Sequence, residues 1–187
     1  MILVYAGRRV DPEDSGAKIR FPAASIPRVV DDVDRVLRQL GPTTVVGSAA
    51  CGSDLLVLEA AGQLGMRRRI VLPFDRKAFR SSSVTDRPGD WGPRFDAVID
   101  DVSARGDLVE LALDPEDDST YSQANVEICT QAESLARVTD ETCAAVVLWN
   151  GSTRGAGDVT EAFMNEVRRR GWSVTEIDTS KRNEDAR

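Results

Sequence analysis

Two glycine-rich segments hold the residues best suited to chemistry. The first is Gly47-Ser48-Ala49-Ala50-Cys51-Gly52-Ser53-Asp54, and the second runs from Asn150 to Asp158 with glycines at 151, 155 and 157. Each follows an apolar run and precedes an amphipathic helical pattern, an arrangement that points free backbone N–H groups at an anion. The amides of 48–54 and 151–158 therefore predict a cradle for a nucleotide-like ligand, although small residues can also simply make tight turns.

Several side chains beside these segments suit the same ligand. Arg8 and Arg9 follow the first apolar run, where an arginine fork would complement a phosphate and a solvated loop is the alternative. Asp54 is either an acceptor for a ribose hydroxyl or a residue favoured by the helix dipole. Tyr121 and Asn125 could read a base or sugar edge, and packing or capping is their alternative. The expected ligand-binding residues are Gly7, Arg8, Arg9, Gly47, Ser48, Ala49, Gly52, Ser53, Asp54, Tyr121, Asn125, Asn150, Gly151, Arg154, Gly155, Gly157, Asp158 and Glu161.

Catalysis, if the chain is an enzyme, has to rest on carboxylates, arginines or backbone dipoles. The chain contains no histidine, which excludes Ser-His-Asp and Cys-His chemistry and most zinc sites. Glu161 or Asp158 would then act as a nucleophile or stabilise an oxocarbenium-like centre. Asp54, Asp158 and Glu161 could also gather around Mg²⁺, but oxygen ligands alone have no diagnostic spacing, so no cofactor is assigned.

Composition narrows the class of protein. The chain has 24 lysines and arginines against 31 aspartates and glutamates, and a net charge of −7 disfavours long nucleic acids as partners. No apolar run is long enough to span a membrane, and the first residues lack the pattern of a signal peptide. The cysteines, Cys51, Cys129 and Cys143, lack metal-site spacing and are expected to be reduced, buried thiols. These features predict a cytoplasmic protein.

The elements that must position these residues follow from the hydrophobic pattern. Expected strands lie at 2–6, 43–47, 69–73, 107–113, 143–149 and 173–177, and expected helices at 25–40, 52–65, 91–104, 120–139 and 157–170. This alternation predicts an α/β fold, a Rossmann-like, doubly wound, mainly parallel sheet of about six strands with helices on both faces. Segment 143–149 is apolar throughout, which favours a central strand.

The predicted sheet also places the two glycine-rich segments together. In open α/β sheets, ligands bind beyond the carboxyl ends of the strands where the strand order reverses, so both segments and residues 5–9 are expected to converge on one crevice. Segment 75–94 is polar and rich in turn residues, and it is expected to be a partly ordered excursion anchored by Phe79, Val84 and Trp91. We expect one domain over 1–178 and a disordered tail over 179–187.

The first glycine-rich segment, followed by Leu58-Glu59-Ala60-Ala61, resembles the SLOG superfamily, the Rossmann-like group that includes DNA-processing protein A and the LONELY GUY phosphoribohydrolases. Those hydrolases carry Pro-Gly-Gly-x-Gly-Thr-x-x-Glu in the second segment. Here 153–161 agrees only at Gly155, Gly157 and Glu161, with Asp158 in the place of the threonine. Segment 121–136 also lacks the arginine of that group, so the catalytic pair that the resemblance implies is incomplete.

Other stretches, including Arg20-Phe21-Pro22, Leu72-Pro73-Phe74 and Leu148-Trp149-Asn150-Gly151, resemble SLOG-like domains found beside signalling or conflict-system modules. That resemblance implies sensing of a nucleotide-derived small molecule, a homo-oligomer, and an effector of signalling or conflict systems as partner. The first hypothesis is therefore a binding or sensing domain. The alternatives are an N-glycosidic hydrolase or nucleoside deoxyribosyltransferase-like enzyme, and a non-catalytic interaction domain. Whether the chain is an enzyme stays open at this point.

Overall fold

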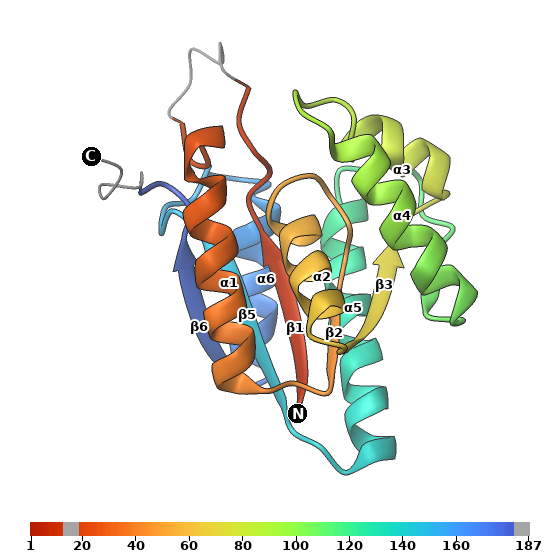
Figure 1. The fold of residues 1–187 in the computed structure, drawn as a ribbon. Coiled ribbons are helices and arrows are strands. Elements are labelled where there is room, and N and C mark those ends of the chain that lie inside the picture. The colour runs from red at the N-terminus through yellow and green to blue at the C-terminus, as the bar shows by residue number, and fades with distance from the viewer. Residues whose placement is uncertain (13–18, 182–187) are drawn as a thin grey trace.

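The computed structural model describes residues 1–12 and 19–181 (Figure 1). The strands in this part of the chain are β1 (Ile2–Gly7), β2 (Thr44–Gly47), β3 (Arg67–Leu72), β4 (Leu108–Glu110), β5 (Cys143–Trp149) and β6 (Ser173–Asp178). The helices are η1 (Ala23–Ser25), α1 (Ile26–Leu40), α2 (Ser53–Gln63), α3 (Arg76–Ser83), α4 (Trp91–Ala104), α5 (Thr120–Thr139) and α6 (Val159–Arg169).

The described strands form one six-stranded sheet in the order β4-β3-β2-β1-β5-β6, and every neighbouring pair is parallel. The chain runs outward from β1 to β4, then returns to place β5 beside β1. Strand order therefore reverses between β1 and β5, the place where open α/β sheets bind ligands. The predicted α/β, Rossmann-like, doubly wound sheet with helices on both faces is confirmed.

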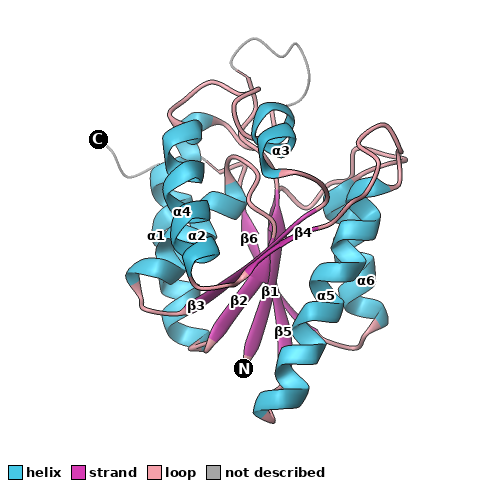
Figure 2. Cartoon of the chain, turned by 90° about the vertical axis from the view of Figure 1, so that its right-hand side faces the viewer, coloured by secondary structure: helices cyan, strands magenta, loops and turns pink. Residues whose placement is uncertain are grey.

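Two hydrophobic layers enclose the sheet, with α1, α2 and α4 on one face and α5 and α6 on the other (Figure 2). Alternate residues of β5 explain its continuous apolar run, because Val146 packs into the first layer and Val147 into the second. β5 pairs with β1 on one side and β6 on the other. It is thus an internal strand, but it lies one place from the sheet edge, and β2 and β1 hold the centre.

The segment expected to be a partly ordered excursion contains a helix instead. Asp75 caps α3 by accepting hydrogen bonds from the backbone N–H groups of Lys77 and Ala78. Phe79 is buried against the first layer, as are the other two expected anchors, Val84 and Trp91. The sequence pattern missed this helix because most of its residues are polar and only its anchors reach the core.

The folded part continues past Asp178, where the expected domain ends. Thr179 is fully buried, and its hydroxyl donates to the carbonyl oxygen of Arg20 at 2.8 Å. Ser25 donates its hydroxyl to the carbonyl oxygen of Lys181 at 2.8 Å. The tail prediction therefore does not hold for 179–181, and 182–187 lie outside the described residues.

All three cysteines are free thiols; Cys51 and Cys129 are buried, as the sequence predicted, whereas Cys143 is only half-buried. Burial raises the pKa of the Cys51 and Cys129 thiols to about 12, so both stay protonated at neutral pH. Among the described residues, no helix combines the length and the apolar character needed to cross a membrane.

We predict that Gly47→Ala destabilises the fold. A Cβ at Gly47, which ends β2, would lie 2.5 Å from Cε2 of the buried Tyr5 ring, so the ring or strand must move. Overpacking of this kind costs about 1–3 kcal/mol. Gly62→Ala in α2 is the matched control, because its Cβ would meet only the flexible Arg68 guanidinium, 2.6 Å away. Urea unfolding should show a clearly lower free energy of unfolding for Gly47→Ala and a change within about 1 kcal/mol for Gly62→Ala. Equal stabilities for the two variants would contradict the tight contact.

Candidate functional site

A cavity of about 240 Å³ lies over the carboxyl ends of β1, β2 and β3, beside the point where the strand order reverses. The N-terminal half of α5, the end of α3 and the loop before α6 complete its walls. The expected residues that line it are Gly7, Arg8, Arg9, Ser48, Asp54, Tyr121, Asn125, Arg154, Gly157 and Asp158. Segments that are far apart in the sequence thus meet at one site.

Asp54 is a carboxyl of the cavity whose pKa burial raises. Its side chain comes from the first turn of α2, the residue is only 7% exposed, and its carboxylate accepts a hydrogen bond from the backbone N–H of Ala50 at 3.1 Å. Burial raises its pKa to about 7, although the Ala50 hydrogen bond and the charge of Arg9 act in the opposite direction. A buried carboxyl with a raised pKa that lines a cavity is typical of a functional site.

The opposite wall is aromatic and neutral. The Tyr121 hydroxyl lies 3.1 Å from the hydroxyl of Ser83, and its ring meets that of Phe74 edge-on at a centroid distance of 6.2 Å. Asn125 is buried and donates from Nδ2 to the carbonyl oxygen of Val159 at 3.0 Å. This wall offers ring faces and uncharged polar groups rather than charges.

The N-terminus of α2 is not an open anion cradle, contrary to the expectation for 48–54. The N–H of Cys51 donates to the carbonyl oxygen of Ser83 at 3.0 Å, and both the N–H and the hydroxyl of Ser53 donate to the carbonyl oxygen of Arg8. Gly52 has a φ of +85°, and a Cβ there would lie 2.8 Å from the N of Val10. The chain after β1 therefore crosses the helix end and takes the donors of Ser53.

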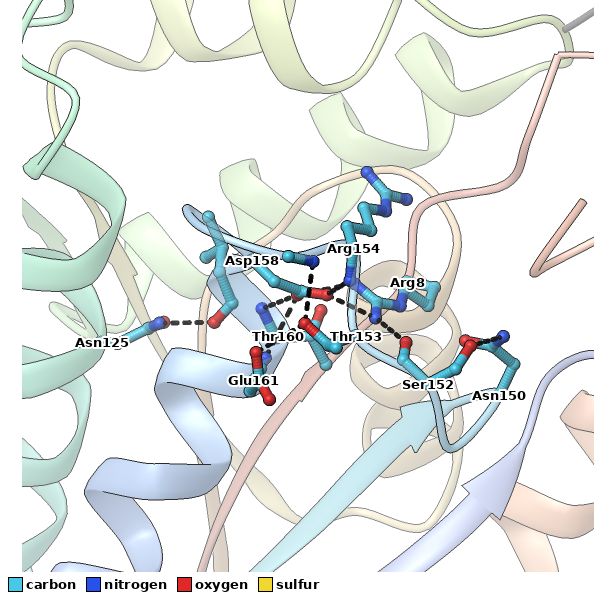
Figure 3. Close-up of polar contacts among 11 residues, drawn as sticks. Arg8, Asn125, Asn150, Ser152, Thr153, Arg154, Asp158, Thr160 and Glu161 are labelled. Carbon is cyan, nitrogen blue, oxygen red and sulfur yellow. Dashed lines mark hydrogen bonds and ion pairs between the residues drawn. The ribbon is translucent and has the colours of Figure 1, made fainter. Parts of the chain in front are cut away.

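Asp158 closes the N-terminus of α6 in a similar way (Figure 3). Its Oδ1 accepts from the backbone N–H groups of Thr160 at 3.0 Å and Glu161 at 3.2 Å, and its Oδ2 from that of Arg154 at 2.6 Å. The Arg8 guanidinium donates to both oxygens at 2.7 Å. Burial raises the pKa of this carboxyl, but these donors outweigh it and hold the pKa at about 2.

The arginines near the cavity differ in their availability. The Arg8 side chain is 2% exposed and also donates to the carbonyl oxygen of Ser152 at 2.7 Å, so its fork is not placed for the phosphate that the sequence suggested. Arg9 pairs with Asp86 at 2.7 Å. Arg154 is an exposed residue that lines the cavity, and its side chain extends away from the Asp158 carboxylate in Figure 3. Partial burial of the guanidinium and the charge of Arg8 lower its pKa.

Glu161, the expected catalytic carboxylate, does not line the cavity. Its Oε2 accepts a hydrogen bond from the Thr153 hydroxyl at 2.6 Å. Within residues 1–12 and 19–181, no three metal-binding side chains come together, so Asp54, Asp158 and Glu161 do not form the Mg²⁺ cluster that the sequence left open. The physical reason is that Asp158 is held by Arg8 and by backbone donors.

Some expected residues have a packing or turn role. Gly7 lines the cavity and is also required where β1 meets α2, because a Cβ there would lie 2.5 Å from the Ser53 hydroxyl oxygen. Asn150 donates to the Ser152 hydroxyl at 2.5 Å. The expected residues outside the cavity lining are Gly47, Ala49, Gly52, Ser53, Asn150, Gly151, Gly155 and Glu161.

Part of the lining was not expected from the sequence. Tyr5, Ala6 and Ala50 belong to segments expected at the crevice but not to the expected ligand-binding residues, and the residues that were missed are Pro73, Phe79, Ser83, Ala124, Ile128, Val159 and Thr160. Pro73 ends the expected strand 69–73, a signal that could have identified it. Phe79 and Ser83 belong to the helix that the sequence pattern did not reveal.

The similarity of this chain to known proteins is weak. No family model matches the chain, and no curated protein does. Among solved structures, DNA processing protein A (DprA) from Streptococcus pneumoniae is similar at 11% identity and a TM-score of 0.41, over 94% of this chain and 58% of DprA. SuiB from Streptococcus suis, bound to S-adenosylmethionine, is similar at 11% identity and a TM-score of 0.29, over 98% of this chain and 40% of SuiB. At these TM-scores neither similarity carries an argument about function, and the SLOG resemblance stays a prediction.

We predict that Asp54 makes stability depend on pH. Its pKa is about 7 in the folded chain and about 3.9 in an unfolded chain, so the folded state binds the proton more tightly. The stability that this tighter proton binding contributes is fully present below pH about 4, falls as the pH rises and is lost above pH about 7. Between pH 5 and 8, the free energy of unfolding of wild type should fall by on the order of 3 kcal/mol relative to that of Asp54→Asn.

Urea unfolding of both proteins at pH 5, 6, 7 and 8 measures this difference. Asp158 does not contribute to it, because its pKa of about 2 keeps the carboxyl ionised over the whole range. Parallel pH profiles for wild type and Asp54→Asn would show that the Asp54 carboxyl is not perturbed by burial.

Proposed function

We propose that the cavity binds the base of a nucleotide-derived small molecule. The observation that carries this proposal is the Asp54 carboxyl, buried in a cavity at the strand-order reversal and faced by an aromatic wall. At about 240 Å³ the cavity is smaller than the usual 300–1,000 Å³ of drug-sized sites, so it suits one ring system rather than a whole dinucleotide.

The chemistry of the walls supports a heterocyclic ring. Phe79 and Tyr121 offer aromatic surface, and aromatic side chains recognise bases by stacking. Asp54 and Asn125 come from α2 and α5 and supply polar groups for the edge of the ring, as carboxylates and amides do for amino and ring nitrogens of bases. With a pKa of about 7, Asp54 can accept an N–H when ionised and donate an O–H when protonated.

Binding is favoured over the alternatives by the same geometry. An N-glycosidic enzyme would rely on Glu161, which lies outside the cavity lining, or on Asp158, whose oxygens are held by Arg8 and backbone donors. A purely structural interaction domain does not need a carboxyl that is both buried and part of a cavity wall, as Asp54 is. Cytoplasmic location, self-association and a signalling or conflict-system effector as partner remain predictions from the sequence.

We expect a panel of nucleobases, nucleosides, nucleoside monophosphates, ADP-ribose, NAD and cyclic nucleotides to contain a compound that raises the Tm of wild type. Asp54→Asn should weaken its binding on the order of tenfold to a hundredfold, since a hydrogen bond to a charged group contributes about 1.5–3 kcal/mol. Glu59→Gln is the matched control, because Glu59 also belongs to α2 but pairs with Arg94 outside the cavity.

Differential scanning fluorimetry measures the binding, and chromatography of the same mixtures tests whether the compound survives. Recovery of the intact compound supports a binding domain. Release of free base that disappears in Glu161→Gln would instead establish the glycosidic enzyme. A panel without any stabilising compound would refute base binding and favour the interaction domain.

A further inference from the structure

The N-termini of α2 and α6, next to the cavity, bind acceptors from the protein itself. At α2, the carbonyl oxygen of Arg8 takes the donors of Ser53, and the carboxylate of Asp54 takes the N–H of Ala50. At α6, the carboxylate of Asp158 takes backbone donors of the first turn. These are the positions at which Rossmann-like folds receive the phosphates of a bound nucleotide.

The surroundings of Asp158 have the composition of a phosphate site. A two-pronged guanidinium, that of Arg8, reaches both carboxylate oxygens at 2.7 Å. Backbone N–H groups from the loop and the helix complete the shell at 2.6–3.2 Å (Figure 3). Bidentate guanidinium contacts and helix N-terminal amides are the two devices by which proteins hold phosphate oxygens. Here the anion they surround is part of the chain.

A ligand phosphate could not share this shell. The Asp158 side chain has no exposed surface, and that of Arg8 is 2% exposed, so neither the donors nor the space around them are open. The Asp158 carboxyl is ionised at neutral pH. A second anion brought beside it would be repelled across a poorly screened, low-dielectric distance.

We propose that Asp158 is an internal substitute for a ligand phosphate, and that the cavity takes a nucleobase or nucleoside without a 5′-phosphate. This inference rests on the proposed base-binding function and narrows its ligand class. The Asp54 side of the cavity holds the ring, while the α6 side is closed by the Arg8–Asp158 pair.

Removing the carboxylate should open the anion site. In Asp158→Ala, the amides of Arg154, Thr160 and Glu161 lose their carboxylate acceptor, and Arg8 keeps only the Ser152 carbonyl oxygen, so inorganic phosphate can take the place of the carboxylate. We expect phosphate to raise the Tm of Asp158→Ala and to leave that of wild type unchanged, with chloride at matched ionic strength as the control. The double variant Arg8→Met/Asp158→Ala should lose the phosphate effect, because it lacks the fork.

Ligand preference is the second readout. Calorimetric titration should show wild type binding at least one of adenosine, guanosine, cytidine and uridine, and binding it at least about tenfold more tightly than its 5′-monophosphate. This ratio should fall or reverse in Asp158→Ala. If that variant does not fold even with phosphate, Asp158→Asn keeps the shape and removes the charge, and it should still reduce the ratio.

The outcomes separate the two proposals. Tighter binding of the monophosphate than of the nucleoside by wild type would overturn this inference and leave base binding intact. If Arg154→Ala then lost the preference for the monophosphate, the phosphate would lie at the cavity mouth. Three other results would also overturn it. Phosphate could stabilise wild type and Asp158→Ala equally, or it could fail to stabilise a folded Asp158→Ala. The third result is an unchanged ratio of nucleoside to monophosphate affinity in Asp158→Asn. Absence of binding by any of these compounds would overturn base binding and the ligand class with it. In that case, a rise in the Tm of Asp158→Ala with inorganic phosphate would still show that Asp158 takes the place of a phosphate.

Discussion

The buried ion pair between Arg8 and Asp158 is the contact on which the candidate site depends. It joins the residue after β1 to the start of α6, 150 positions later in the chain, across the point where the strand order reverses. Burying two charges is costly unless both are fully hydrogen-bonded. Asp158 meets that condition through the Arg8 fork and the surrounding amides, whereas Arg8 uses its two terminal nitrogens and leaves Nε buried without a partner among the described residues. These bonds hold the loop before α6 against the sheet.

The two acids of the cavity show how partners decide the state of a carboxyl. Asp54 accepts one backbone hydrogen bond, and burial dominates its pKa, which rises to about 7. Asp158 is also buried, but the Arg8 fork and backbone amides hold its pKa at about 2. Environments that give two carboxyls such different pKa values also give them different roles. One can exchange a proton with a ligand, whereas the other is a fixed charge of the fold.

Close approach of backbones shapes the other end of the cavity. The chain after β1 crosses the N-terminus of α2, and this crossing requires glycine at positions 7 and 52. Ser53 fixes it with a hydroxyl bond to the Arg8 carbonyl oxygen at 2.7 Å. As a result, Asp54 in the next position lines the cavity while the helix end itself is covered. Gly52, one of the glycines that suggested a phosphate cradle, is therefore explained by packing of the chain on itself.

Hydrophobic patterning alone determined the parallel sheet, because a strand covered on both faces, such as β5, must be apolar throughout. It also placed Arg8, Asp54 and Asp158 at one edge, since the carboxyl ends of parallel strands meet there. Tertiary structure decided that α3 forms on buried Phe79 and that Arg8 pairs with Asp158 rather than facing a ligand. Apolar periodicity is a local property of the chain, whereas the pairing of a donor with an acceptor 150 residues away depends on how the elements pack.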